Sequence, residues 1–306
     1  KEKEELYYSF TNYVTPGTIY KYNIEEGTSE VYNKPNITFN PDDYESKQVF
    51  YTSKDGTKVP MIITHKKGLE LDGKNPTMLY GYGGFNVSLT PSFSTANAIW
   101  MEQGGVYAVP NLRGGGEYGK EWHLMGQKSN KPNTWKDFIS CAEYLIDKGY
   151  TSEQYLAGQG GSAGGILIGR AITERPDLFQ CAIINVGCMD MLRMETTTNG
   201  VPNIKEFGSV KTREGFDALL AMSSFHHVVD GVDYPAVLST HGVNDPRVEP
   251  WFSAKMTARL QTATSGNRPI LFRVDYDAGH GIGSTKMQRY EKQADIWAFL
   301  LWQFGQ

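Results

Sequence analysis

The sequence predicts an α/β protein with a mostly parallel, doubly wound sheet, preceded by a few strands of a separate β unit. Two patterns support this prediction. From residue 77 onward, short apolar runs of strand length alternate with runs of helical periodicity. Such alternation is typical of a parallel sheet that helices cover on both faces. Before residue 41, short runs rich in tyrosine and β-branched residues follow one another with turn residues between them.

The first 40 residues are expected to form the small β unit. Residues 6–10, 18–22 and 29–32 have strand composition, and Glu26-Gly27 supplies a turn before the third run. Residues 35–43 contain asparagine, proline and aspartate, which indicates a linker. Three or four strands bury little apolar surface, so the unit is expected to belong to a larger sheet. We therefore expect one domain at residues 1–40 and a second at residues 41–306.

The second domain is expected to open with a hairpin, because residues 48–52 and 58–64 flank the turn residues Lys54-Asp55-Gly56. Strands are then expected at residues 77–82, 106–109, 155–158, 181–186, 236–240 and 270–274. Helices are expected at residues 95–103, about 163–174, 251–264 and 285–304. A further helix is expected to start at the capping residues Asn133-Thr134, because the apolar residues from Trp135 to Ile146 follow a 3.6-residue period.

Composition excludes several classes of function. The net charge of the 306 residues is −4, which gives no electrostatic case for nucleic acid or an acidic membrane surface. No apolar run reaches the roughly 18 residues that a membrane span needs. Three cysteines without a C-x-x-C pair predict neither a disulfide framework nor a zinc ribbon, and no metal-binding motif is visible, so no metal or cofactor is expected. The opening Lys1–Glu5 is not a signal peptide and has no methionine, so the chain is expected to start within a longer protein. The compartment, cytoplasmic or periplasmic, stays open.

The motif Gly160-Gly161-Ser162-Ala163-Gly164-Gly165 lies between an expected strand and an expected helix. G-x-S-x-G in this context is typical of a nucleophile elbow, a strained turn that presents a serine hydroxyl. Side chains at the flanking positions would collide with neighbouring backbone, which explains the glycines. The N–H groups at the start of the helix suit a developing oxyanion. We therefore interpret Ser162 as a nucleophile.

The same segment also fits a dinucleotide-binding pattern, G-x-G-x-x-A, at Gly158, Gly160 and Ala163. That pattern requires an acidic residue at the end of the following strand, where this sequence has Asn185. Asp177 has the right distance but precedes the strand. A nucleotide site and a glycine-rich turn without chemistry remain alternatives, and serine chemistry is favoured.

A serine nucleophile needs a histidine base and an acid that orients it, and in α/β-hydrolases the chain order is serine, acid, histidine. His280 lies in a glycine-rich loop between the last expected strand and the last expected helix, where a doubly wound sheet places its site. His241 ends a strand but precedes the best acid candidate. His226 and His227 follow a helical stretch and are expected at the surface or in packing.

The acid candidates are aspartates that follow Ser162. Asp245 comes directly after a strand, in His241-Gly242-Val243-Asn244-Asp245-Pro246-Arg247. Asp275 and Asp277 are close to His280 in sequence and are therefore less suitable. Asp245 is our candidate, with a solvated turn residue as the alternative.

Five separated motifs occur in a fixed order: Tyr80-Gly81-Tyr82-Gly83-Gly84-Phe85-Asn86, Asn111-Leu112-Arg113-Gly114-Gly115-Gly116-Glu117-Tyr118-Gly119, the serine elbow, Asp245-Pro246-Arg247-Val248 and Ala278-Gly279-His280-Gly281. Together they resemble the prolyl oligopeptidase family of serine peptidases, over nearly the whole chain. The resemblance implies an α/β-hydrolase fold capped by a seven-bladed β-propeller. Residues 1–40 would be the end of the last blade, and the rest of the propeller would be a partner domain absent from this chain.

The resemblance also assigns roles. It implies a triad of Ser162, Asp245 and His280, with the Tyr82 hydroxyl and the Ala163 backbone N–H as oxyanion donors. Arg247 would bind a backbone carbonyl of the substrate. The pocket for the residue before the cut would be lined by Phe85, Val186, Phe207 and Val248.

Two positions depart from the family. In the family, the loop after the segment that matches Met189-Asp190-Met191-Leu192 supplies a tryptophan that stacks on the substrate proline. An ungapped count places Asn203 at that position in this sequence. At the other position, Ala163 replaces the asparagine often found after the serine. An alanine there also occurs in the related oligopeptidase B type, which cuts after basic residues. Glu206 is the nearest acid that could hold a basic side chain, and we expect it to be a solvated glutamate. Because Asn203 cannot supply the indole of the missing tryptophan, we expect a loosened preference for proline.

The leading hypothesis is a serine endopeptidase that hydrolyses short peptides after proline through an acyl-enzyme. The alternatives are an oligopeptidase of broader or basic specificity, an esterase-type α/β-hydrolase on the same triad, and a catalytically silent interaction module. Short peptides are the expected partners, with no nucleic acid, membrane, metal or cofactor.

Overall fold

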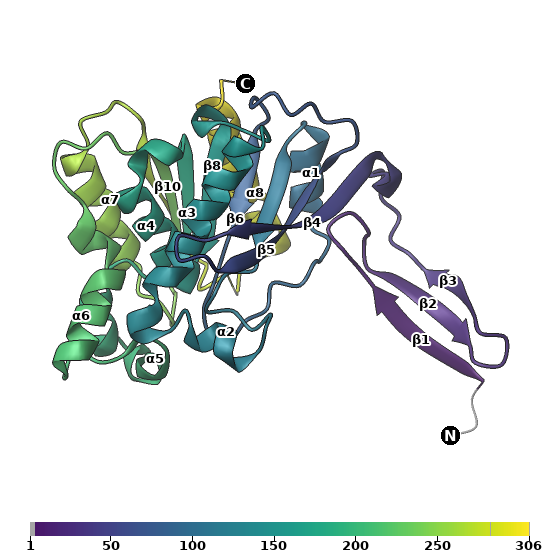
Figure 1. Ribbon diagram of the computed structural model, residues 1–306, viewed down its shortest axis with the longest axis horizontal. Helices are drawn as coiled ribbons and strands as arrows, with labels where there is room; N and C mark the ends of the chain where they lie inside the picture. Colours follow the sequence, from purple (N-terminus) through teal and green to yellow (C-terminus); the bar gives the residue numbers. More distant parts are fainter. Residues whose placement is uncertain (1–3, 282, 306) are drawn as a thin grey trace.

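A computed structural model describes residues 4–281 and 283–305 of the chain. Residues 1–3 of the opening segment, Ile282 of the histidine loop and Gln306 lie outside the described residues. The body of the molecule is built on an eight-stranded sheet in the order β11-β10-β9-β8-β6-β7-β5-β4 (Figure 1). Its strands are β4 (Tyr44–Thr52), β5 (Lys58–Lys66), β6 (Thr77–Tyr80), β7 (Val106–Pro110), β8 (Leu156–Gly161), β9 (Cys181–Asn185), β10 (Ala236–Gly242) and β11 (Ile270–Asp275).

Six neighbouring strands of this sheet, from β11 to β7, run parallel, and the β4–β5 hairpin adds two antiparallel strands at one edge. The mostly parallel sheet is therefore confirmed. The strands keep the expected order along the chain, with ends that shift by a few residues. β6 ends at Tyr80, so Tyr82 lies in the turn beyond it, and β4 begins at Tyr44 rather than at residue 48.

Helices cover both faces of the sheet. The helices of the described residues are α1 (Thr95–Glu102), α2 (Lys120–Leu124), α3 (Pro132–Asp147), α4 (Ala163–Glu174), α5 (Gly200–Phe207), α6 (Arg213–Met222), α7 (Trp251–Ala263) and α8 (Lys286–Gln303). Helices α3, α4 and α7 pack on one face, and α1 and α8 on the other (Figure 1).

Neighbouring residues of the strands point into two separate apolar clusters. In β6, Leu79 lies in the cluster under α3, α4 and α7, whereas Met78 lies in the cluster under α1 and α8. This follows from the two-residue period of a strand. In the second cluster the Trp100 and Trp297 rings stack at a centroid distance of 5.1 Å. The central strands of the sheet are thus buried on both faces, which explains their near-continuous apolar sequences.

The start of α3 differs from the prediction. The helix begins at Pro132, after Lys131, and the side chains of Asn133 and Thr134 do not cap it. Instead Asn133 donates to the Met125 carbonyl at 2.9 Å and Thr134 to the Arg113 carbonyl at 2.9 Å. Proline suits the first turn of a helix because its φ is preset and its missing N–H would have no helical partner.

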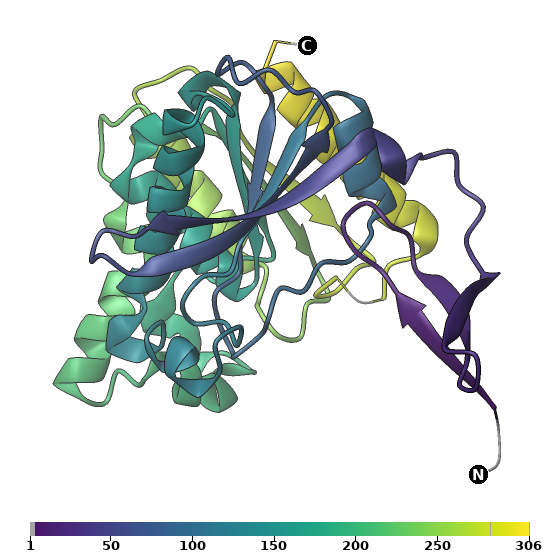
Figure 2. The ribbon, with the colours of Figure 1, turned by 45° about the vertical axis from the view of Figure 1, so that its right-hand side comes forward.

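The N-terminal residues form their own antiparallel sheet in the order β1-β2-β3, with β1 (Glu5–Phe10), β2 (Thr18–Asn23) and β3 (Thr28–Asn33). Figures 1 and 2 show that it extends away from the α/β body. Two aromatic contacts join the connection between β1 and β2, and the segment after β3, to the body. Tyr13 packs edge to face on Tyr107 at 5.6 Å, and Phe39 stacks on Tyr44 at 4.4 Å. The unit therefore has an exposed tip and a buried base.

Candidate active site

Ser162 lies in the turn between β8 and α4, and its backbone is strained. Its φ is 56° and its ψ is −119°, values that few non-glycine residues adopt. The strained turn is held by hydrogen bonds from the Ser162 N–H to the Asn185 carbonyl, 2.9 Å, and from the Cys188 N–H to the Ser162 carbonyl, 3.1 Å. A Cβ on Gly160 would lie 2.5 Å from the Gly164 carbonyl oxygen, so the flanking glycines are required. The twelve-residue helix α4 begins directly after the serine.

Asp245 and His280 come together from two loops at the carboxyl ends of neighbouring strands. Asp245 follows β10, and His280 lies between β11 and α8. The His280 Nδ1 is 2.6 Å from the Asp245 Oδ2. The other carboxylate oxygen accepts the backbone N–H groups of Arg247, at 2.8 Å, and Val248, at 2.9 Å. The carboxylate is thus held rigidly and can orient the imidazole.

The charge of Asp245 is stabilised by its donors. Burial by itself would raise the pKa of Asp245. The opposing hydrogen bonds from His241, His280 and the two backbone N–H groups outweigh burial and hold the pKa well below its usual value. Asp245 is therefore an anion at neutral pH, as an orienting acid must be.

A cavity of about 250 Å³ joins the serine, the histidine and most of the expected binding residues. Ser162 and His280 lie on its wall, and the other residues predicted from the sequence that line it are Tyr82, Phe85, Asn203, Phe207, Arg247 and Val248. Phe85 and Phe207 form one apolar side, with rings edge to face at 5.4 Å. The Ala163 side chain is buried at the start of α4.

Val186 is not among the lining residues of this cavity, contrary to our expectation. It has a φ of 46° and lines a second, much smaller cavity of about 20 Å³ behind the His280 loop. The chain turns sharply after β9, so Cys188 takes a place in the main cavity instead. Sequence reasoning also missed Met194 and Asn199. They precede α5, a helix that we did not predict, and periodicity alone gives no signal for them.

Tyr82 is suited to donate a hydrogen bond. Its side chain is half-buried, and burial raises the pKa of Tyr82 to about 12. The phenol therefore keeps its proton at neutral pH, which a hydrogen-bond donor to an oxyanion requires.

Glu206 is buried, and our expectation of a solvated glutamate was wrong. Only 3% of its surface is exposed. Its Oε1 accepts the Phe85 N–H at 2.8 Å, and its Oε2 lies 2.8 Å from the His123 Nε2. Both oxygens are therefore engaged with protein groups, and Glu206 does not line the cavity next to it. The partners lie 121 and 83 residues away in sequence, which is why the pattern of residues does not reveal them.

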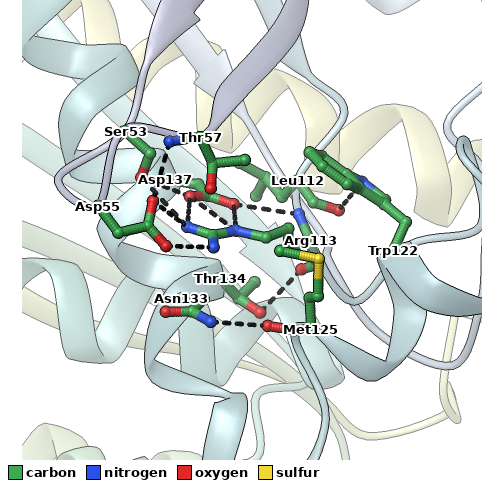
Figure 3. A network of polar contacts seen from close by, with 10 residues as sticks. All are labelled: Ser53, Asp55, Thr57, Leu112, Arg113, Trp122, Met125, Asn133, Thr134 and Asp137. Atoms are coloured by element: carbon green, nitrogen blue, oxygen red, sulfur yellow. Dashed lines mark hydrogen bonds and ion pairs between the residues drawn. The ribbon is translucent and has the colours of Figure 1, made fainter.

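In the second motif, residues 111–119, the buried Arg113 is the centre of a network of polar contacts (Figure 3). Arg113 Nη2 is 2.5 Å from Asp137 Oδ1, and Arg113 Nη1 is 2.5 Å from Asp55 Oδ2. The hydrogen bond from Arg113 lowers the pKa of Asp55 to about 2. The carbonyl of Gly114, the residue after Arg113, accepts the Asn86 N–H at 3.2 Å. The segment that this network fixes therefore contacts the turn that follows Tyr82.

Within residues 4–281 and 283–305, no group of three or more histidine, cysteine, aspartate or glutamate side chains is arranged to hold a metal ion. No helix in the same part of the chain is both long enough and apolar enough to cross a membrane.

Comparison with known families decides between the classes of α/β protein. The model of the prolyl oligopeptidase family matches residues 91–306, and that of the prolyl oligopeptidase N-terminal β-propeller domain matches residues 1–35. This chain belongs to the prolyl oligopeptidase family. The α/β-hydrolase fold with preceding propeller strands is thereby confirmed.

Relatives within the prolyl oligopeptidase family match 97% or more of this chain. A prolyl endopeptidase of Elizabethkingia meningoseptica is 51% identical over 306 residues, which is all of this chain and 43% of that protein. A prolyl endopeptidase of Dictyostelium discoideum is 41% identical over 97% of this chain and 40% of its own length. A solved structure from a study of two prolyl endopeptidases superposes with a TM-score of 0.95 at 42% identity, over 99% of this chain and 45% of that one. The chain thus spans less than half the length of these relatives.

Proposed function

We propose that this chain is the catalytic part of a serine peptidase that hydrolyses short peptides after proline. Membership of the prolyl oligopeptidase family and the prolyl endopeptidase relatives support this reaction class. The observation that carries the assignment of residues is the 2.6 Å contact between His280 and Asp245 beside the cavity that Ser162 also lines.

In this proposal Ser162 Oγ attacks the carbonyl carbon of the scissile bond, and its proton passes to Nε2 of His280. Asp245 holds the Nδ1–H side of the ring, which leaves Nε2 for the serine. The Tyr82 hydroxyl and the Ala163 N–H stabilise the oxyanion. His280 then gives the proton to the leaving amine, and a water molecule hydrolyses the acyl-enzyme by the same route.

Residues 1–40 are proposed to be the end of a propeller, with the domain boundary at residue 41. The match of residues 1–35 to the propeller model supports this. The propeller would act as a lid that admits short peptides and excludes folded proteins. In the full-length protein, an octapeptide should therefore be cut much faster than a folded protein of casein size, and equal rates would contradict the lid.

The preference for proline is proposed to be loosened, with small residues such as alanine also accepted. The Asn203 amide in the wall of the cavity favours this loosened specificity. No indole face is then available at position 203 to cover a proline ring.

A fluorophosphonate probe tests the nucleophile in the full-length protein. We expect one adduct on Ser162, and loss of both the adduct and peptide turnover in Ser162→Ala, with a rate lower by about four to six orders of magnitude. Ser265→Ala, which changes an exposed serine, is the matched control and should behave as the parent. If Ser162→Ala keeps more than about a tenth of the parental rate, Ser162 is not the nucleophile. Comparing peptide amides with short acyl esters separates a peptidase from an esterase.

A further inference from the structure

The turn that follows Tyr82 is a strained part of the cavity wall. Phe85 has a φ of 55° and Asn86 a φ of 57°, both in the left-handed region. Each such residue costs free energy and persists only where surrounding contacts fix it. This turn carries Tyr82 at its start and Phe85 in the cavity. The contacts that hold the turn therefore control the position of a proposed oxyanion donor and of a pocket wall.

One of these contacts is a buried lysine. Lys131 precedes α3, is 1% exposed, and its Nζ donates a hydrogen bond to the Gly83 carbonyl oxygen. Burial lowers the pKa of Lys131 to about 8, although the nearby Glu206 carboxylate acts to raise it. A lysine buried this deeply is costly, and the proposed mechanism gives it no chemical step.

The other contact is Glu206 of α5, which accepts the Phe85 N–H at 2.8 Å. Glu206 is in turn fixed by His123, at 2.8 Å, and by Gln127, at 3.3 Å. Lys131 thus holds the carbonyl on one side of Gly84, and Glu206 holds the N–H on the other side. The ammonium group of Lys131 is a donor and suits the carbonyl, and the carboxylate of Glu206 is an acceptor and suits the N–H.

Gly84 lies against all the relevant groups. A Cβ on Gly84 would be 3.3 Å from Lys131 Nζ, 3.5 Å from Glu206 Oε1 and 3.4 Å from the Ala163 Cβ. The turn is therefore pressed between the two charged side chains and the first residue of α4, whose N–H is the second proposed oxyanion donor.

We propose that Lys131 and Glu206 are positioning residues that clamp the Gly83–Phe85 turn and thereby aim the Tyr82 hydroxyl at the oxyanion; this rests on the proposed function. The clamp acts through Tyr82 and touches no reacting atom. Burying two charges is a weak source of stability, since apolar replacements of buried charged pairs are often neutral or stabilising. Removing both charges should therefore leave the fold intact and lower kcat.

A double-mutant cycle in the full-length protein tests the clamp. Lys131→Met, Glu206→Gln and the two combined are made both in the parent and in Tyr82→Phe, and kcat and KM are measured for one peptide. In the parent, Lys131→Met is expected to lower kcat by about tenfold or more with KM changed by less than about threefold. In Tyr82→Phe the same change should lower kcat by less than about threefold, because the donor it positions is already gone. Lys136→Met, an exposed lysine of α3, is the matched control.

The outcomes separate the two proposals. Equal losses of kcat in the parent and in the Tyr82→Phe background, or no loss in either, would overturn the clamp. A Tyr82→Phe protein with parental kcat would instead overturn the oxyanion role of Tyr82, and an active Ser162→Ala would overturn the proposed function. Thermal unfolding of each variant is measured alongside. If Lys131→Met alone does not fold, the charge-free Lys131→Met/Glu206→Gln protein takes its place in the cycle, with the same expected split.

Discussion

The Nε2 of His241 lies 3.3 Å from Oδ2 of Asp245, the same oxygen that contacts His280. His241 is fully buried, and Nε2 also lies 2.8 Å from the Val248 carbonyl, which can only accept, so this nitrogen carries a proton. Its Nδ1 is 2.7 Å from the Ser253 Oγ. His241, which we did not choose as the base because it precedes Asp245 in the chain, thus contacts the proposed acid. It does not line the main cavity.

These donors make the stability of the protein depend on pH at its acid end. The pKa of Asp245 is depressed in the folded state, so its contribution is present above the unfolded value of about 4 and is lost as the pH falls below it toward the folded value. Urea unfolding of the parent and of Asp245→Asn should give free energies whose difference shrinks below about pH 4. A difference that stays constant from neutral pH to about pH 3 would contradict the depressed pKa.

Tyr82→Phe should lower kcat with little change in KM. A donor aimed at the oxyanion acts mainly in the transition state, and loss of one typically costs about 2.7–4 kcal/mol. Tyr118→Phe, which removes the hydroxyl of an exposed tyrosine, is the control. Steady-state kinetics on one peptide measures both constants. A raised KM with parental kcat would assign Tyr82 to ground-state binding.

The buried Arg113 network should matter for folding far more than a surface pair does (Figure 3). Arg113→Met leaves Asp137, which is 0% exposed, without its main partner, and removal of one member of a buried pair typically costs about 3–5 kcal/mol. Arg273→Met breaks the more exposed contact with Asp295, where a loss under about 1 kcal/mol is expected. Urea unfolding of both variants checks the contrast. Equal losses would mean that burial does not decide the cost.

Local patterns were enough to place the elements that carry chemistry. The α4 helix runs from Ala163 to Glu174, as predicted, because glycines mark its start and an apolar period defines its length. The short helices α2 and α5 were not predicted, since five and eight residues give little periodicity. Helix α6 corresponds to the helical stretch expected before His226. Asn203, expected in a loop, lies on α5.

Contacts between distant residues could not be predicted in this way. The burial of Glu206 depends on His123 and on the Phe85 N–H, and no local pattern joins them. Cys188 lines the cavity because the chain turns at Val186, whose positive φ is rare for a β-branched residue. Such conformations are imposed by the packed surroundings, and sequence propensity points away from them.

Asn203 occupies the position at which the family resemblance implies a tryptophan. Asn203 lines the cavity, and its Nδ2 donates to the Asn199 carbonyl at 2.9 Å, one helical turn earlier. A proline ring laid over this amide would gain no stacking and would remove water from a polar group. Phe85, Phe207 and Val248 still give the cavity an apolar wall, so small residues should be accepted beside proline.

Asn203→Trp should therefore raise kcat/KM for a peptide with proline before the cut more than for its alanine counterpart. Aromatic stacking is worth about 0.5–1.5 kcal/mol, so the proline-to-alanine ratio should rise by roughly two- to tenfold. Val201→Trp is the matched control, because Val201 lies on the same helix with 67% of its surface exposed. The ratio is measured for parent, Asn203→Trp and Val201→Trp in the full-length protein. A parental ratio that is already high and does not respond to Asn203→Trp would show that another residue, such as Phe207, provides the platform for proline.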